Sequence, residues 1–164
     1  MREIEVKILE IDPEEIRKRL LALGAEKIFD GEIDMVSFDY PDERLFKAGK
    51  LLRVRKVGSE VELCFKGQKE DSQYKTREEI EVNTSAFKDT ITILEEAGLK
   101  IFYRGQKHRE SYKLGKVRFE IDDIPGIPIF VEIEAPTEEE VKENVEKLGY
   151  TMEQTTNLSG RRLR

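Results

Sequence analysis

The sequence is poor in the residues that most often build metal and redox sites: it has one cysteine, one histidine and no tryptophan. A single cysteine, Cys64, excludes a disulfide within the chain and a zinc site built on several cysteines. A single histidine, His108, excludes a multi-histidine metal site and argues against a histidine-dependent triad. No apolar run approaches the ~18 residues of a membrane span, and the first residues are charged where a signal peptide is apolar. We therefore expect a cytoplasmic protein without a membrane segment.

Charge is abundant. The 164 residues include 29 Lys+Arg and 35 Asp+Glu, for a net charge of −6. Charged residues make up 39% of the chain, against roughly 25% in an average domain. The acidic balance argues against general nucleic-acid binding. No low-complexity linker and no sequence repeat divides the chain, so we expect a single domain over residues 1–164.

Three segments have the apolar periodicity and the end signals of amphipathic helices. They lie between Asp12 and Gly24, from about Ser85 to Gly98, and from Thr137 to Gly149. Asp12 precedes a proline at the first helical position, and Thr137 with Glu140 forms a capping box. A glycine ends each segment, as is common at helix C-termini.

Most of the remaining sequence alternates apolar and charged residues with the period of two that strands require. The expected strands lie near residues 3–8, 27–39, 52–55, 61–66, 77–82, 99–104, 107–111, 117–122 and 129–134. Eight or nine short strands with few helices predict an α+β fold built on a mostly antiparallel barrel or curved sheet.

The charged faces of these strands allow two interpretations. In one, they are the solvated outer face of a sheet whose other face is the core, as in most β proteins. Against it, the charges are segregated by sign: carboxylates repeat at Glu79 and Glu81, and cations repeat at Arg53 and Arg55. Like charges on neighbouring strands repel unless something binds between them.

In the second interpretation the charged faces line the inside of a barrel, and the apolar faces turn outward beneath the three helices. A barrel of about eight strands can hold a small ligand. A lining of both cations and carboxylates suits a polyphosphate with a divalent metal, because guanidinium and ammonium groups bind phosphate and carboxylates bind Mg²⁺ or Mn²⁺. The alternation alone leaves both interpretations open.

Several segments, in order, resemble the CYTH superfamily, which is named for class IV adenylyl cyclases and thiamine triphosphatases. EIEVK, with Glu3, Glu5 and Lys7, is similar to the ExExK signature of that superfamily. Further along the chain the resemblance rests on five segments: FDYPDERLFKAGKLLRVRK, ELCFKG, REEIEV, QKHRESY and FEIDDIPGIPIFVEIE. Together they cover nearly the whole chain, and their order makes the match more specific than any one of them.

The resemblance implies a closed antiparallel β-barrel of about eight strands, a triphosphate tunnel with a charged interior, flanked by about three amphipathic helices. It implies metal ligands, or acids beside them, at Glu3, Glu5, Asp122, Glu132 and Glu134, with Glu79 and Glu81 as further members. It implies phosphate-binding residues at Arg53, Arg55, Lys66, Lys107 and Arg109. Lys7 matches the signature lysine, and its implied role is to position the attacking group or the adjacent phosphate.

The function implied is that of a Mg²⁺- or Mn²⁺-dependent enzyme acting on ATP or a polyphosphate, with a homodimer as its possible assembly. The compact chain and the spacing from QKHRESY to VEIE are nearest to the class IV cyclases, which convert ATP to cyclic AMP and pyrophosphate. The alternatives are a triphosphatase acting on tripolyphosphate, a nucleoside triphosphate or thiamine triphosphate, and a non-catalytic polyphosphate or nucleotide binder.

Three features are assigned no chemistry. Cys64 lies on the charged face of its strand and is interpreted as a small filler, because no basic residue accompanies it in a triad-like pattern. His108 alternates away from Lys107 and Arg109, which favours a surface or packing role. The C-terminal TTNLSGRRLR departs from the family pattern, so neither Ser159 nor Arg161 receives a role.

Overall fold

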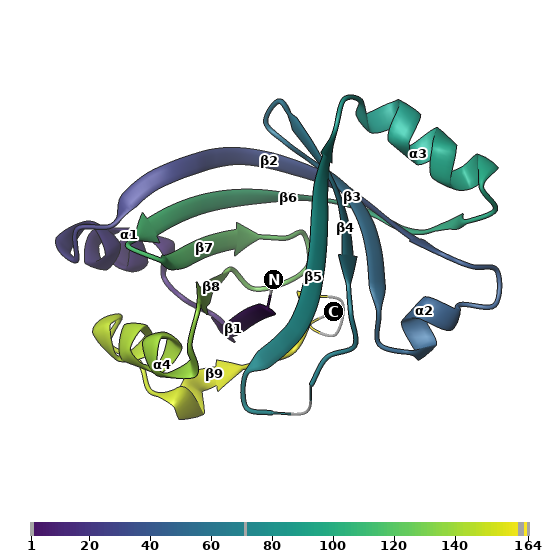
Figure 1. The fold of residues 1–164 in the computed structure, drawn as a ribbon. Helices are drawn as coiled ribbons and strands as arrows, with labels where there is room; N and C mark the ends of the chain where they lie inside the picture. Colours follow the sequence, from purple (N-terminus) through teal and green to yellow (C-terminus); the bar gives the residue numbers. More distant parts are fainter. Residues whose placement is uncertain (1, 71, 161–162, 164) are drawn as a thin grey trace. The chain divides into compact units, whose positions relative to one another are not determined.

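The computed structural model describes residues 2–70, 72–160 and 163, with the side chains of Arg2 and Glu3 left undescribed (Figure 1). The described strands are β1 (Arg2–Ile8), β2 (Glu26–Asp39), β3 (Leu51–Val57), β4 (Glu60–Lys66), β5 (Lys75–Thr84), β6 (Lys100–Leu114), β7 (Val117–Asp123), β8 (Phe130–Ala135) and β9 (Thr155–Thr156). The helices are α1 (Pro13–Ala22), α2 (Arg44–Lys47), α3 (Phe87–Glu96) and α4 (Glu138–Lys147), with a 3₁₀ turn η1 (Met152–Gln154).

The strands form one hydrogen-bonded sheet in the order β5-β4-β3-β2-β6-β7-β8-β1-β9. An additional pairing of β5 with β1 closes the sheet, so β1 to β8 make a closed antiparallel barrel and β9 is an extra strand on β1. The predicted α+β barrel of about eight strands is confirmed. The three predicted helices correspond to α1, α3 and α4.

The chain groups into two compact units. Unit 1 comprises residues 31–69 and 77–107, and unit 2 comprises residues 2–30, 70–76 and the chain from 108 onward. The long strands β2, β5 and β6 contribute residues to both units. Each unit has its own hydrophobic core, so each is described by itself.

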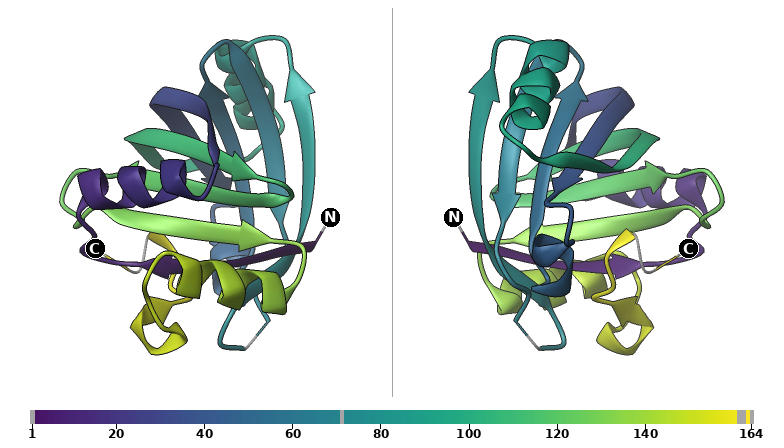
Figure 2. Two further views of the ribbon diagram at one scale, coloured as in Figure 1. Left: turned by 90° about the vertical axis from the view of Figure 1, so that its left-hand side faces the viewer. Right: turned by 90° about the vertical axis from the view of Figure 1, so that its right-hand side faces the viewer.

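In unit 2 the apolar core lies between the helices and one face of the strands. Val6 and Ile8 of β1 and Ile133 of β8 are fully or almost fully buried. They pack in one cluster with Ile16 and Leu20 of α1 and with Val141, Val145 and Leu148 at α4. Figure 2 shows α1 and α4 alongside these strands. The helices therefore cover the apolar face, and the opposite face of the same strands carries the charges.

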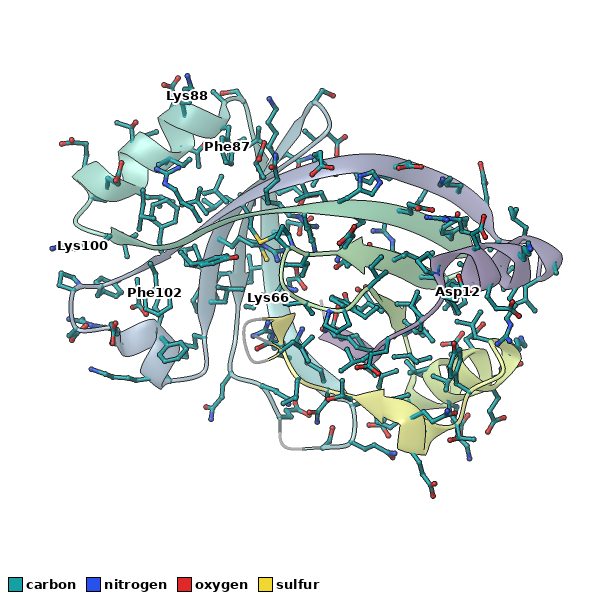
Figure 3. The ribbon with its side chains drawn as sticks, turned by 180° about the vertical axis from the view of Figure 1, so that it is seen from behind. Asp12, Lys66, Phe87, Lys88, Lys100 and Phe102 are labelled. Atoms are coloured by element: carbon teal, nitrogen blue, oxygen red, sulfur yellow. The ribbon has the colours of Figure 1, made fainter. Side chains whose placement is uncertain are left out.

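Unit 1 repeats the arrangement on a smaller scale. Val36, Phe38, Val54 and Val61 come from β2, β3 and β4, and they form a buried cluster with Ile91 of α3. Phe87, in the first turn of α3, packs against the same cluster and is labelled in Figure 3. Since directly paired residues point to the same side of a sheet, Arg53, Cys64 and Glu81 all lie on the face opposite this core.

Local signals in the sequence position the covering helices. Asp12 accepts a hydrogen bond from the backbone N–H of Glu14 (3.0 Å), and Thr137 accepts one from the backbone N–H of Glu140 (3.1 Å). Gly149 ends α4 with φ +84°, and a Cβ there would lie 2.6 Å from a guanidinium nitrogen of Arg19. That guanidinium donates a hydrogen bond to the carbonyl of Leu148, which ties α1 to the end of α4.

One expected boundary differs. Residues 99–104 and 107–111 were expected as two strands, but they form the single strand β6. Its alternation is interrupted at Gly105, where a Cβ would lie 2.6 Å from the ring of Tyr103. Because Gly105 has no side chain, the Tyr103 ring can lie over its backbone and the strand continues without a break. Within the described residues, every helix is too short or too polar to cross a lipid bilayer.

The contact of α1 with β6 supplies a pH-dependent test of the fold. Arg17 Nε donates to both carboxylate oxygens of Glu110 (3.0 Å each), and another guanidinium nitrogen donates to Oε1 (2.6 Å). These hydrogen bonds outweigh burial and lower the pKa of Glu110. A carboxyl group whose pKa is lowered by folding stabilises the fold above its unfolded pKa of ~4.3, and this contribution is lost as the pH falls.

Arg17→Met should therefore lower the free energy of unfolding at pH 7, and its deficit relative to the wild type should shrink at about pH 3.5. Urea denaturation at both pH values measures this difference. Lys18→Met removes the same charge from an exposed neighbouring position of α1, and it should produce no such pH-dependent deficit. A deficit of equal size at both pH values for Arg17→Met would show that the contact acts through packing alone.

Candidate functional site

In unit 2, strand register brings six of the predicted site residues to one face. Glu5 pairs with Glu134, and Lys7 pairs with Glu132, across the β1–β8 ladder. Glu132 in turn pairs with Glu120 across β8–β7, and Asp122 pairs with Arg109 across β7–β6. Directly paired side chains lie on the same side of an antiparallel sheet, which is the side opposite the core under α1 and α4.

Glu5, Glu132 and Glu134 form a group of carboxylates suited to a cation. One oxygen from each lies within 4.8 Å of the others. Glu5 and Glu132 are buried, and Glu134 is partly buried. Carboxylate oxygens at this separation are the ligands that hard divalent cations such as Mg²⁺ and Mn²⁺ prefer. The donor set therefore fits a divalent metal of that class.

Lys7 lies between these carboxylates. Its Nζ is 2.7 Å from Oε2 of Glu132 and 3.2 Å from Oε1 of Glu5. Burial lowers the pKa of Lys7, but the charges of Glu132 and Glu5 outweigh this effect and hold that pKa above its ordinary value. Lys7 is consequently a cation at neutral pH, a donor of hydrogen bonds and not a proton acceptor.

A second lysine, Lys75, also binds Glu5. Its Nζ forms an ion pair with Oε1 of that carboxylate, and both side chains are buried. Sequence reasoning missed Lys75 because it follows the charged segment QKEDSQY, where no apolar alternation indicates a strand. Its spacing of two from Arg77 and four from Glu79, on the same face of β5, was the available signal.

Arg109 is held by two carboxylates. Its Nε and one terminal nitrogen donate to the two oxygens of Asp122 (2.6 and 2.7 Å), and the other terminal nitrogen forms an ion pair with Glu120. Burial lowers the pKa of Arg109, but the charges of Glu120 and Asp122 hold it well above its ordinary value. Glu120, which was not among the predicted site residues, is thus part of this network.

Glu132 experiences the opposing charges of the same network. Burial and the neighbouring Glu5 raise its pKa, while Lys7, Lys75 and Arg109 lower it, and the lowering prevails. Glu132 is therefore a carboxylate at neutral pH despite being buried. This ionised state is the one that a cation or a lysine can bind.

Unit 1 has a second charged face with predicted site residues. Arg53 and Arg55 of β3 pair with Cys64 and Glu62 of β4, and Lys66 of β4 pairs with Glu79 of β5. Lys66 Nζ lies 3.2 Å from Oε2 of Glu79. Arg55 forms an ion pair with Glu62, and a terminal nitrogen lies 3.8 Å from Oε2 of Glu81. Lys107, in β6, is buried.

Cys64 lies on this charged face, as its parity indicated. The structure adds that its side chain is buried. Its thiol donates a hydrogen bond to Oε1 of Glu79 (3.0 Å). Burial raises the pKa of Cys64 to about 12, and the charge of Glu79 adds to this effect against the opposing charges of Arg53 and Lys66. Burial and the charge of Glu62 also raise the pKa of Glu81. The thiol is therefore protonated at neutral pH and is a poor nucleophile.

Other residues singled out in the sequence lie elsewhere or outside the described part. His108 Nε2 is 2.8 Å from Oδ1 of Asp30, and both side chains are more than one-third exposed, which places the histidine at the surface. In the C-terminal segment, Thr155 and Thr156 pair with β1, and Asn157 donates a hydrogen bond to the carbonyl of Ser72 (2.5 Å). The side chain of Glu3 and all of Arg161 lie outside the described residues.

The environment of Cys64 predicts a thiol that is inert in the folded protein. A pKa of about 12 leaves about one thiolate in 10⁴ molecules at pH 8, and the side chain is fully buried. We expect negligible reaction with a thiol-reactive maleimide in the native state and complete reaction once guanidinium has unfolded the chain. Because the chain has one cysteine, mass spectrometry reads the result directly. Rapid native labelling would mean that the strand opens or that the thiol is activated.

Comparisons with known proteins find similar sequences and similar folds. A Methanocaldococcus jannaschii protein named "putative adenylate cyclase" is 31% identical over 134 residues, which span 82% of this chain and 77% of that protein. The solved structure of protein PH1012 from Pyrococcus horikoshii superposes with a TM-score of 0.84 at 26% identity and covers 98% of both chains. A Hippeastrum structure described as a "putative adenylyl cyclase" with a dominant triphosphatase activity gives 0.71 at 18% identity, over 96% of this chain and 91% of that one.

The family comparison covers almost the entire chain. The CYTH domain matches residues 1–159, a range that includes every strand and helix described above. The ordered motifs, the closed barrel with its charged faces and the similarity to the archaeal relatives agree with that match. The chain belongs to the CYTH domain family.

Proposed function

We propose that this protein is a divalent-metal-dependent enzyme that cleaves a triphosphate, and that its reaction is the cyclisation of ATP. One observation carries the proposal: a group of carboxylates, Glu5, Glu132 and Glu134, lies beside buried cations on a single sheet face. A triphosphate with its metal presents both charges at once, so it requires carboxylates and cations together.

Glu5, Glu132 and Glu134 would hold the metal in this proposal. The bound ion supplies neutralisation of negative charge on the phosphate oxygens. Asp122 has a different task, because both of its oxygens accept hydrogen bonds from Arg109. It fixes the guanidinium plane, and Glu120 fixes it from the other side.

The cations bind the phosphates. Lys7 and Arg109 are protonated at neutral pH because nearby carboxylates raise their pKa values. They therefore donate hydrogen bonds to phosphate oxygens and stabilise charge on the leaving group. By the family resemblance we assign phosphate binding also to Arg53, Arg55, Lys66 and Lys107. Lys7 orients the attacking group or the phosphate next to it, and it does not act as a base.

In the cyclisation, the 3′-oxygen of ATP bonds to the α-phosphorus and gives its proton to water, while the bond from that phosphorus to the bridging oxygen breaks and pyrophosphate takes the electron pair. The products are cyclic AMP and pyrophosphate. The support for this reaction is the relative at 31% identity that is named "putative adenylate cyclase".

The second candidate is hydrolysis of a triphosphate, in which water attacks the terminal phosphorus and the bond from that phosphorus to the bridging oxygen breaks. The diphosphate part is the leaving group, and the attacked phosphoryl group becomes orthophosphate. Two observations favour it. The Hippeastrum protein with the same fold is described as having a dominant triphosphatase activity. Moreover, every residue assigned above has chemistry suited to phosphates or a metal, and none recognises a nucleobase.

Product analysis tests the proposal. The purified protein is incubated with Mg²⁺ or Mn²⁺ and, separately, ATP, tripolyphosphate or thiamine triphosphate, and the products are separated by anion exchange. Cyclic AMP with pyrophosphate supports the cyclase. Orthophosphate without cyclic AMP contradicts the cyclase and establishes the second candidate. If no product forms but tripolyphosphate raises the melting temperature, the protein is a binder and not an enzyme.

Replacing a proposed metal ligand should abolish turnover. We expect Glu132→Gln to lower product formation by about 100-fold or more, because it removes a charged ligand from the group. Glu78→Gln is the matched control, since Glu78 is exposed on the other face of β5, and it should retain activity. Circular dichroism of both variants separates loss of activity from loss of fold. A fully active Glu132→Gln would remove the carboxylate from the proposed site.

A further inference from the structure

Arg77 of β5 is a buried cation outside the ion-pair networks described above. Its side chain is only 9% exposed. Its Nε is buried and has no hydrogen-bond partner among the described residues. No carboxylate in the described part of the chain forms an ion pair with it. The position was included in the REEIEV segment of the sequence but received no role.

The other ionisable residues on the same face of β5 are all paired. Alternation along the strand gives Lys75, Arg77, Glu79 and Glu81 one common face. Lys75 pairs with Glu5, Glu79 pairs with Lys66, and Glu81 lies 3.8 Å from a nitrogen of Arg55. Arg77 thus stands between paired residues as a cation whose charge the described carboxylates leave unbalanced.

A buried charge without a counter-ion is unfavourable, and an arginine cannot relieve the cost by losing its proton. Folding tolerates such a group where a ligand supplies the opposite charge. The guanidinium presents its donors as a planar fork that matches two oxygens of a phosphate group. Figure 1 shows β4 beside β5. Lys66 of β4 pairs with Glu79, two residues along β5 from Arg77, so it adds a second cation to the same sheet face.

We infer that Arg77 binds a phosphate group of the substrate, an inference that rests on the proposed triphosphate chemistry. To bind an anion, Lys66 must give up its ion pair with Glu79. Arg77 has no ion pair with a described residue to give up. Arg77 is therefore a cation of unit 1 that can bind a phosphate without giving up an ion pair. Arg77 thus joins the phosphate-binding cations that were assigned by the family resemblance, and its role is substrate binding.

The test separates binding from folding. Arg77→Gln and Arg77→Lys are compared with the wild type by thermal denaturation without ligand and by titration with tripolyphosphate, with and without Mg²⁺. Removal of an uncompensated buried charge should leave the ligand-free melting temperature unchanged or raise it. The affinity of Arg77→Gln for tripolyphosphate should fall by about 10- to 100-fold. Arg77→Lys, which keeps the charge but not the fork, should be intermediate.

Two control variants define the alternatives. Arg104→Gln removes the same charge from an exposed position of β6 in unit 1, and it should bind tripolyphosphate like the wild type. Lys66→Gln leaves Glu79 without its lysine, so it should lower the ligand-free melting temperature. If Arg77→Gln loses thermal stability as Lys66→Gln does and keeps wild-type affinity, Arg77 is structural and the inference is wrong.

Measurements on the wild-type protein show whether the inference about Arg77 fails alone or together with the proposed function. If the wild type binds tripolyphosphate and both Arg77 variants bind it equally well, the inference falls and the proposed function stands. If the wild type neither binds nor cleaves tripolyphosphate or ATP, with or without Mg²⁺, both fall together. Affinity lost in Arg77→Gln alone, with Arg104→Gln unaffected, supports the phosphate contact.

Discussion

The fold depends on the compensation of buried charge. In unit 2, Lys7, Lys75 and Arg109 are buried next to the carboxylates that neutralise them. Removing either partner of such a pair leaves a charge in a poorly solvated interior, which costs about 3–5 kcal/mol. Cations and carboxylates on this face therefore cannot vary independently. The same dependence explains why Glu120 accompanies Asp122 at Arg109.

In each unit the charged sheet face leaves only the opposite face for a hydrophobic core, and that core must be covered by helices. Val6 and Ile133 point away from the charged face and are sealed by α1 and α4, while Val54 and Val61 are sealed by α3. Each unit accordingly has a separate core. The Thr137 cap and the Arg19 contact fix the two ends of α4. Because α4 packs on the apolar side of the strands, these contacts also hold in place the strands that carry the charged face.

The sequence predicted the elements well, because alternation and helix periodicity are local. The segregation of charge by sign at Arg53 and Glu79 indicated an unusual sheet face, and family motifs identified most of its members. Lys75 and Glu120 were missed for a physical reason: their significance lies in cross-strand partners, which depend on register. Lys75 also follows a polar segment without periodicity. Arg77 is noteworthy only once burial shows that no described carboxylate balances it.

Each charged face carries both signs of charge. In unit 2, the cations Lys7, Lys75 and Arg109 contact carboxylates of β1, β7 and β8. In unit 1, Lys66 contacts Glu79 and Arg55 contacts Glu62. An anion that binds to such a face competes with these carboxylates for the cations. A divalent cation relieves the competition because it binds the carboxylates, and this is the physical reason why the proposed triphosphate and the proposed metal belong together.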